Sequence, residues 1–130
     1  MPLDDIPLVD VRVLRQSKRA LGGEFDRVFG YFLDDGAKSL AHIERATRTT
    51  NTSQIILPAH CIKGEALHFG AHRLAVLASQ IEFDARDCVE RRIELTSMIV
   101  DIARLRPLFD ESVAAIKQLV GTGQEKRRAA

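Results

Sequence analysis

The 130-residue chain has few cysteines and no long apolar run. Its two cysteines, Cys61 and Cys88, are too few for a disulfide framework and lack the spacing of a metal site such as CxxC. No stretch approaches the roughly 18 to 20 apolar residues of a membrane span. The first five residues, MPLDD, are acidic where a signal peptide would be basic. We therefore expect reduced thiols and a soluble, cytoplasmic protein.

The chain also lacks an excess of charge of either sign. Its 19 basic and 18 acidic residues give a net charge of +1, which offers no broad attraction to nucleic acid or to an anionic membrane. The basic run Lys126-Arg127-Arg128 is typical of a solvated terminal tail. A glycine-rich phosphate loop is also missing.

Apolar residues recur at helical spacing almost throughout, and no alternating run predicts a strand. We expect one all-α domain, an antiparallel four-helix bundle with a short N-terminal helix, whose core covers about residues 9–121 and whose ends, 1–8 and 122–130, are flexible. The helices are predicted from about Val9 to Gly22-Gly23, Glu24 to Thr49, Ser53 to Phe69, Gly70 to Val89 and Leu95 to Val120.

Four places interrupt these patterns. Asp35-Gly36 could weaken the second helix or form a turn. Pro58 fits the third helix best within its first turn. Pro107 predicts a kink or a split in the last helix, and Gly121-Thr-Gly123 predicts its end.

The most informative segment surrounds His60. On a helix of about 100° per residue, with His60 as the origin, Lys63 lies at roughly −60°, Leu67 at roughly −20° and Gly64 at roughly +40°. The opposite side carries an apolar stripe that would face the core, made of Ala59, Ile62, Ala66 and Phe69. We therefore expect His60 to point outwards, with a cation one turn away.

This pattern suits a histidine that carries a phosphoryl group. A neutral imidazole is a competent nucleophile near neutral pH and a good leaving group once phosphorylated. Lys63 can offer a positive charge to phosphoryl oxygens. Gly64 leaves room for the active site of a second protein, although the same glycine could instead permit contact between two helices.

The residues Ala59-His60-Cys-Ile-Lys63-Gly64-Glu-Ala-Leu-His-Phe-Gly70-Ala71, followed by Leu74 and then Ile81-Glu82, resemble the signature of histidine phosphotransfer (HPt) domains. That signature has Lys and Gly three and four positions after the histidine, and a second Gly at the tenth. Leu67 and His68 depart from it, because the family usually has a small residue and often a polar amide there. Leu67 could narrow the choice of partner.

The resemblance implies a stand-alone phosphocarrier of a two-component phosphorelay, not an enzyme. His60 would accept a phosphoryl group from a receiver-domain aspartate of a histidine kinase and pass it to a response-regulator receiver aspartate. Lys63 matches the lysine that faces the phosphoryl group, Gly64 the access glycine and Gly70 the glycine of the helix junction. The chain itself would hold no cofactor or metal, since the receiver supplies Mg²⁺.

A partner-binding surface is predicted around His60. Leu67 and Ala71 share its face by spacing, Leu57 lies near it, and Gly70 adjoins them. Leu67 could instead be half-buried against a neighbouring helix. We expect a monomer.

Two other functions stay open. His68 and His72, four residues apart, could belong to a metal-binding bundle with Cys61, His60 and Glu65 nearby, although Gly70 lies between the two histidines. The chain could also be an adaptor with an HPt-like fold that docks without carrying a phosphoryl group.

Overall fold

The computed structural model describes the backbone of residues 2–129 and the side chains of residues 2–121. Its elements are the α-helices α1 (Val11–Leu21), α2 (Phe25–Arg48), α3 (Ser53–His68), α4 (His72–Arg91) and α5 (Ile99–Ala129), and the 3₁₀ turns η1 (Leu3–Asp5), η2 (Gly22–Glu24) and η3 (Leu95–Met98). The described residues contain no strand, so the all-α prediction is confirmed. None of the described helices is long and apolar enough to span a membrane.

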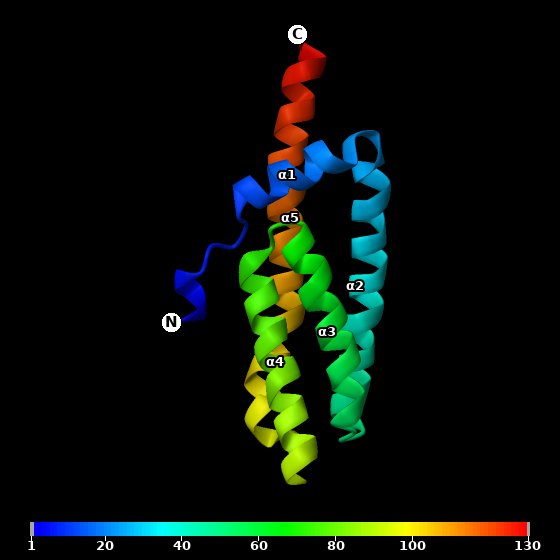
Figure 1. The fold of residues 1–130 in the computed structure, drawn as a ribbon, viewed down its shortest axis with the longest axis vertical. Coiled ribbons are helices and arrows are strands. Elements are labelled where there is room, and N and C mark those ends of the chain that lie inside the picture. Colours follow the sequence, from blue (N-terminus) through cyan, green and yellow to red (C-terminus); the bar gives the residue numbers. More distant parts are fainter. Residues whose placement is uncertain (1, 130) are drawn as a thin grey trace.

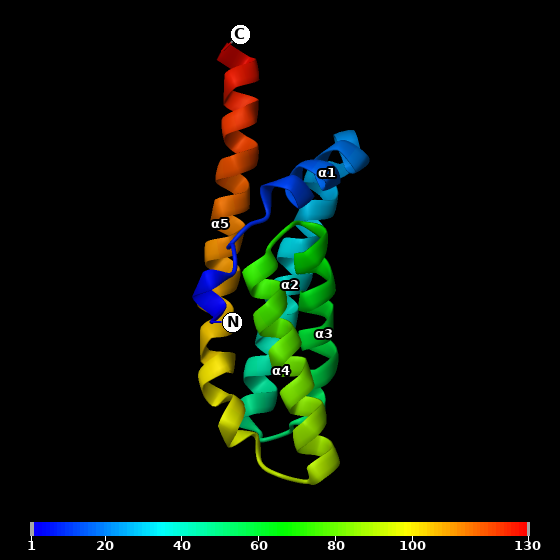
Figure 2. The same cartoon turned by 60° about the vertical axis from the view of Figure 1, so that its left-hand side comes forward.

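Helices α2 to α5 form an antiparallel four-helix bundle. Short connections turn the chain back between successive helices, and α1 crosses the end of the bundle where α3 meets α4 (Figure 1). Figure 2 shows α3 and α4 side by side along most of their length, with α5 extending past α1. Helix α3 packs against both α2 and α4, so its buried face lies at the centre of the bundle.

The core confirms the predicted apolar stripe of α3. Ala59, Ile62, Ala66 and Phe69 are each at most 2% exposed. Phe69 belongs to a cluster of aromatic rings whose centroids lie 5.2–5.9 Å apart, formed with Phe25, Phe29, Phe32 and Phe109. Aromatic pairs at such distances contribute about 0.5–1.5 kcal/mol each beyond the area that they bury.

Helix α2 runs without a break through Asp35-Gly36. A Cβ atom at Gly36 would overlap the ring of Phe109, so this glycine lets α5 pack closely on α2. Helix α3 begins at Ser53 as predicted, but Pro58 lies beyond its first turn, so the predicted place of this proline is wrong.

Helix α5 continues through Pro107, so of the two predicted alternatives, a kink or a split, the split is wrong. Pro107 lies on the exposed side of the helix, where water can satisfy the carbonyl that its ring leaves without a donor. The predicted end at Gly121–Gly123 is also wrong, because α5 continues to Ala129 and Gly121 does not take the left-handed conformation of a C-cap. The side chains of the predicted flexible end, 122–130, lie outside the described residues.

Leu3 and Leu8 of the N-terminal segment pack against the core, and the flexibility predicted for residues 1–8 stays a prediction. Ile6 is only 9% exposed. The side chain of Arg73, at the start of α4, donates hydrogen bonds to the carbonyls of Ile6 at 2.8 Å and Asp4 at 3.2 Å. The amide of Arg73 also donates to the carbonyl of Pro7 at 3.2 Å. These contacts between distant parts of the chain fasten the segment to the bundle.

Helix α1 is fixed across the junction between α3 and α4. The amide of Asp10 donates to the carbonyl of Gly70 at 2.7 Å, and the Asp10 side chain caps α1. The Ser17 hydroxyl donates to the carbonyl of His68. Gly70 has a φ of 76°, and a Cβ atom there would lie 2.6 Å from the Asp10 carbonyl oxygen. The junction therefore requires glycine both for its backbone conformation and for space.

Candidate functional site

His60 lies in the middle of α3, and its side chain is 54% exposed. The buried stripe of Ala59, Ile62 and Ala66 holds the other side of the helix in the core. The outward orientation of His60 is therefore confirmed.

Glu82 of α4 fixes the imidazole. Its two carboxylate oxygens lie 3.1 and 3.2 Å from Nδ1 of His60. A carboxylate only accepts hydrogen bonds, so the Nδ1 atom carries the hydrogen and donates it. The lone pair of the neutral ring then resides on Nε2, to which no residue in the described part of the chain makes a hydrogen bond. The arrangement presents a nucleophilic nitrogen to solvent.

The carboxylate of Glu82 is 9% exposed and is held by two cations. Lys63 donates to Oε1 at 2.8 Å, and the Nη2 atom of Arg86 donates to Oε2 at 2.9 Å. Burial raises the pKa of Glu82, but the hydrogen bonds from Lys63, Arg86 and His60 outweigh it and lower this pKa to about 2. Glu82 is therefore an anion at neutral pH.

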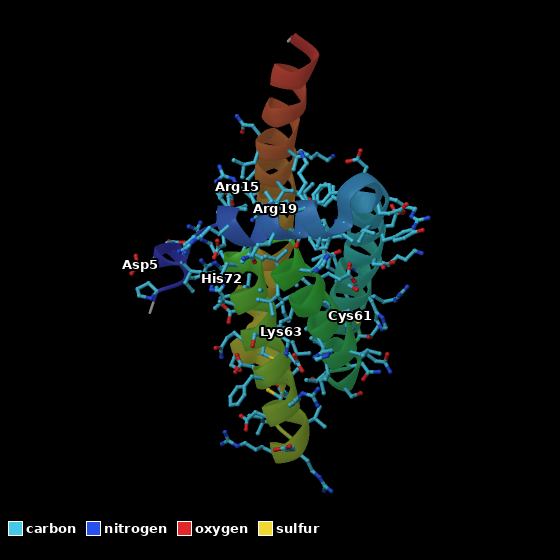
Figure 3. All side chains as sticks on the ribbon, turned by 45° about the horizontal axis from the view of Figure 1, so that its top comes forward. Asp5, Arg15, Arg19, Cys61, Lys63 and His72 are labelled. Atoms are coloured by element: carbon cyan, nitrogen blue, oxygen red, sulfur yellow. The ribbon has the colours of Figure 1, made fainter. Side chains whose placement is uncertain are left out.

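The charges around His60 give the site a positive balance. Lys63 and Arg86 bring two positive charges, and Glu82 brings one negative charge. Figure 3 labels Lys63 on the face of the bundle that α3 and α4 form. Its ammonium donates to Glu82 of α4. Such a balance favours an anionic group beside the imidazole.

Gly64 borders open space. Apart from its chain neighbours and the backbone of its own helix, no atom of the described residues lies within 4 Å of the place that its Cβ would occupy, so the alternative in which this glycine permits contact between two helices is wrong. A shallow groove runs beside it between α2 and α3, lined in part by Tyr31, Asp35 and Glu65. Burial, and then the charge of Asp35, raise the pKa of Glu65 to about 7.

The structure separates the four residues predicted to bind a partner. Leu57 is 69% exposed and Leu67 is 47% exposed. Ala71 is 0% exposed, so its predicted place on the face of His60 is wrong, and Gly70 is buried at the junction between α3 and α4. Helix α3 ends at His68, and the chain then turns beneath α1, so the helical angle that placed Ala71 beside His60 no longer applies.

The histidine pair of the metal-binding alternative does not lie on one helix. His68 ends α3 and His72 begins α4, with the turn at Gly70 between them. Among the described residues, no group of three or more His, Cys, Asp or Glu side chains could hold a metal ion.

Sequence reasoning missed the roles of Glu82 and Arg86. Glu82 entered only as the end of the HPt-like segment. A signal was available, because residues 60 and 82 each lie eleven positions from residue 71, where the chain turns between two antiparallel helices. Counting outward from that turn brings His60 and Glu82 opposite each other.

Both the sequence and the fold resemble those of known proteins. A family model described as the Hpt domain matches residues 27–120. A search of curated protein sequences finds no match.

Among solved structures, histidine-containing phosphotransfer protein B from Pseudomonas aeruginosa PAO1 has a TM-score of 0.77 and 23% identity, over 86% of this chain and 93% of that chain. A histidine-containing phosphotransfer protein from Medicago truncatula has a TM-score of 0.75 and 23% identity, over 95% of this chain and 84% of that chain. The HPT domain of a sensor hybrid histidine kinase from Shewanella has a TM-score of 0.69 and 14% identity, over 88% of this chain and 95% of that chain. At these identities the likeness shows the fold.

Proposed function

The chain belongs to the Hpt domain family of histidine phosphotransfer proteins, and on that premise we propose that His60 is the residue that carries the phosphoryl group. The observation that supports this role best is the hydrogen bond from Nδ1 of His60 to Glu82, which leaves Nε2 free on the surface. Partners of this family are receiver domains, which carry the phosphoryl group on an aspartate.

The transfer would proceed by in-line attack. The Nε2 lone pair of His60 attacks the phosphorus of the receiver's aspartyl phosphate. A P–N bond forms while the P–O bond to the aspartate breaks, and the aspartate leaves as a carboxylate. The ring keeps its Nδ1 hydrogen and becomes positively charged, and the Glu82 carboxylate at 3.1 Å stabilises that charge. The reverse steps return the phosphoryl group to a receiver.

Lys63 and Gly64 have separate roles in this proposal. Lys63 stands beside the imidazole as a positive charge for the phosphoryl oxygens, while also holding Glu82 at 2.8 Å. Gly64 leaves the surface open where the receiver's active site must approach. Neither residue forms or breaks a covalent bond.

The receiver would supply the remaining chemistry. It brings the phosphorylated aspartate and the Mg²⁺ that carboxylates and phosphoryl oxygens hold. This chain would therefore act as a phosphocarrier without ATP-dependent kinase activity and without a cofactor of its own. A stand-alone role stays a prediction.

The receiver would dock around His60 on exposed apolar side chains. Leu57 and Leu67 lie on α3, and Tyr31 of α2, which is 55% exposed, lies along the groove beside Gly64. Exposed apolar side chains gathered beside a reactive group are typical of a partner surface. Tyr31 is far from Leu57 and Leu67 in the sequence and lies near this surface because α2 packs against α3.

Incubation with a radiolabelled phosphorylated receiver domain tests this function. We expect label on the wild-type protein that survives base and is lost in acid, as a phosphohistidine requires. His60→Gln should take no label, while His72→Gln, which changes another exposed histidine, should be labelled as the wild type is. Label that persists in His60→Gln would move the acceptor elsewhere. Receiver binding without label would instead indicate a docking adaptor.

A further inference from the structure

Arg86 makes contacts that the proposed roles of Lys63 and Gly64 do not explain. It lies on α4, one turn after Glu82, and its side chain is 55% exposed. Both its Nε, at 3.2 Å, and its Nη2, at 2.9 Å, donate to the same oxygen, Oε2 of Glu82. An exposed pair four residues apart on a helix adds little to stability, so the contact is better explained by what it does to Glu82.

The carboxylate of Glu82 is held by one cation from α3 and by one from its own helix, α4. Lys63 of α3 binds Oε1, and Arg86 of α4 binds Oε2. The Nδ1 atom of His60 lies at nearly equal distances from both oxygens, 3.2 and 3.1 Å. Without Arg86, Oε2 would keep only the hydrogen bond from His60, and the carboxylate could turn towards Lys63. The orientation of the imidazole would then be less well defined.

Arg86 also decides the charge of the site. A phosphoryl group that approaches Nε2 carries negative charge, and the anionic Glu82 alone would repel it. Lys63 offsets the charge of Glu82, and Arg86 supplies the surplus positive charge.

We propose that Arg86 is a positioning residue for phosphoryl transfer. Acting through Glu82, it holds the His60 ring with Nε2 towards solvent, and it keeps the acceptor site positive. This inference rests on the proposed role of His60 as the acceptor.

The same helix offers a matched control. Arg91 pairs with Asp87 four residues before it, at 3.3 Å, and its side chain is 65% exposed. Arg91→Gln therefore removes the same kind of ion pair from α4, at a position that does not contact His60 or Glu82.

The test compares two phosphoryl donors. Phosphoramidate is a small donor that needs no docking surface: its P–N bond breaks, a P–Nε2 bond to His60 forms, and ammonia leaves. A phosphorylated receiver domain needs both docking and chemistry. We expect Arg86→Gln to slow labelling by both donors by the same factor, roughly tenfold, as is typical when a group that orients another is removed. Arg86→Lys should restore most of the rate, and Arg91→Gln should match the wild type.

The ¹⁵N chemical shifts of His60 can show whether Arg86→Gln changes the orientation of the ring or unfolds the protein. The ¹⁵N chemical shifts of His60 report which ring nitrogen carries the hydrogen. In Arg86→Gln we expect them to move from the pattern with hydrogen on Nδ1 towards a mixture of the two tautomers, while thermal unfolding stays close to that of Arg91→Gln.

Each contrary result identifies what fails. Wild-type rates and wild-type ¹⁵N shifts in Arg86→Gln would overturn the positioning role. Slower labelling from the receiver alone would overturn it too, because Arg86 would then be a docking contact. If Arg91→Gln lost as much of the labelling rate as Arg86→Gln, the slower rate would reflect only the lower net charge of the protein, and the positioning role would be wrong. If the wild-type protein takes no label on His60 from either donor, the proposed function itself fails.

Discussion

Glu82 and His60 are 22 residues apart in the sequence, yet Glu82 Oε2 lies 3.1 Å from the Nδ1 atom of His60. This contact between α3 and α4 leaves the ring's second nitrogen free for reaction. It also places a buried negative charge next to a ring that would become positive in the proposed phosphoryl transfer. A chain that supplies only an acceptor needs little more than these two residues and the cations around them.

Glu82→Gln should slow the labelling of His60 by phosphoramidate by at least about tenfold, because an amide holds the tautomer of an imidazole less reliably than a carboxylate does. The variant also removes the anion that stabilises the charged ring. Glu90→Gln, at an exposed position on the same helix, is the control and should react like the wild type. Equal rates for all three proteins would show that Glu82 plays no part in the transfer.

The ionisation of Glu82 should also stabilise the fold in a defined pH window. Burial raises its pKa, but the hydrogen bonds from Lys63, Arg86 and His60 outweigh this and bring it from 4.5 to about 2. A pKa lowered in the folded state gives stability that is present above pH 4.5 and is lost as the pH falls towards 2.

Urea unfolding at pH 6 and pH 3 measures this contribution. Between these values the wild type should lose more free energy of unfolding than Glu82→Gln does, by about 2 kcal/mol. Parallel losses in the two proteins would contradict the low pKa.

Glu65 should have the opposite effect. Burial and then the charge of Asp35 raise its pKa to about 7, so the folded protein binds a proton that the unfolded chain has already released. The free energy of unfolding should therefore fall as the pH rises from 4.5 to 7. Glu65→Gln should be as stable as the wild type at pH 4 and more stable at pH 8. A variant that is less stable at pH 8 would mean that the carboxylate is stabilised by contacts.

Gly64→Ala should separate stability from function. No atom lies near the added Cβ, so the helix should gain about 0.5–1 kcal/mol in free energy of unfolding. Labelling by phosphoramidate should be retained, because the small donor needs less room. Transfer from a phosphorylated receiver should become slower. If transfer from the receiver were unchanged, Gly64 would not be needed to let the receiver's active site approach.

Two glycines of α2 should respond in opposite ways to alanine. At Gly36 the new Cβ would overlap the buried ring of Phe109, so Gly36→Ala should destabilise the protein by about 1–3 kcal/mol. At Gly30 nothing lies within 4 Å, so Gly30→Ala should stabilise the same helix by about 0.5–1 kcal/mol. Thermal or urea unfolding of the pair checks this. A stable Gly36→Ala would mean that Phe109 can move aside.

The sequence predicted the site best where one uninterrupted helix decides the outcome. Within α3 the helical angle correctly separated the exposed His60 from the buried Ile62. The same angle failed for Ala71, because a turn, which depends on the left-handed Gly70 and on α1 above it, intervenes.

Contacts between elements were harder to predict. Glu82 reaches His60 only because the turn sets the register of α4 against α3. The role of Arg86 can be recognised only once that of Glu82 is known, because Arg86 contacts Glu82. The N-terminal residues have two prolines and little helical pattern, yet hydrogen bonds from Arg73 hold their backbone in place. Such contacts depend on the tertiary structure and leave no periodicity in the sequence.

The bond from the Asp10 amide to the Gly70 carbonyl shows that the folding unit is larger than the recognisable domain. The family match begins at residue 27, but Leu14 of α1 is 3% exposed and belongs to the same core as Phe69. A fragment trimmed to the matched residues would uncover the end of α3 two turns from His60. Shortened versions of this protein should therefore keep α1 if their reactivity is to represent that of the whole chain.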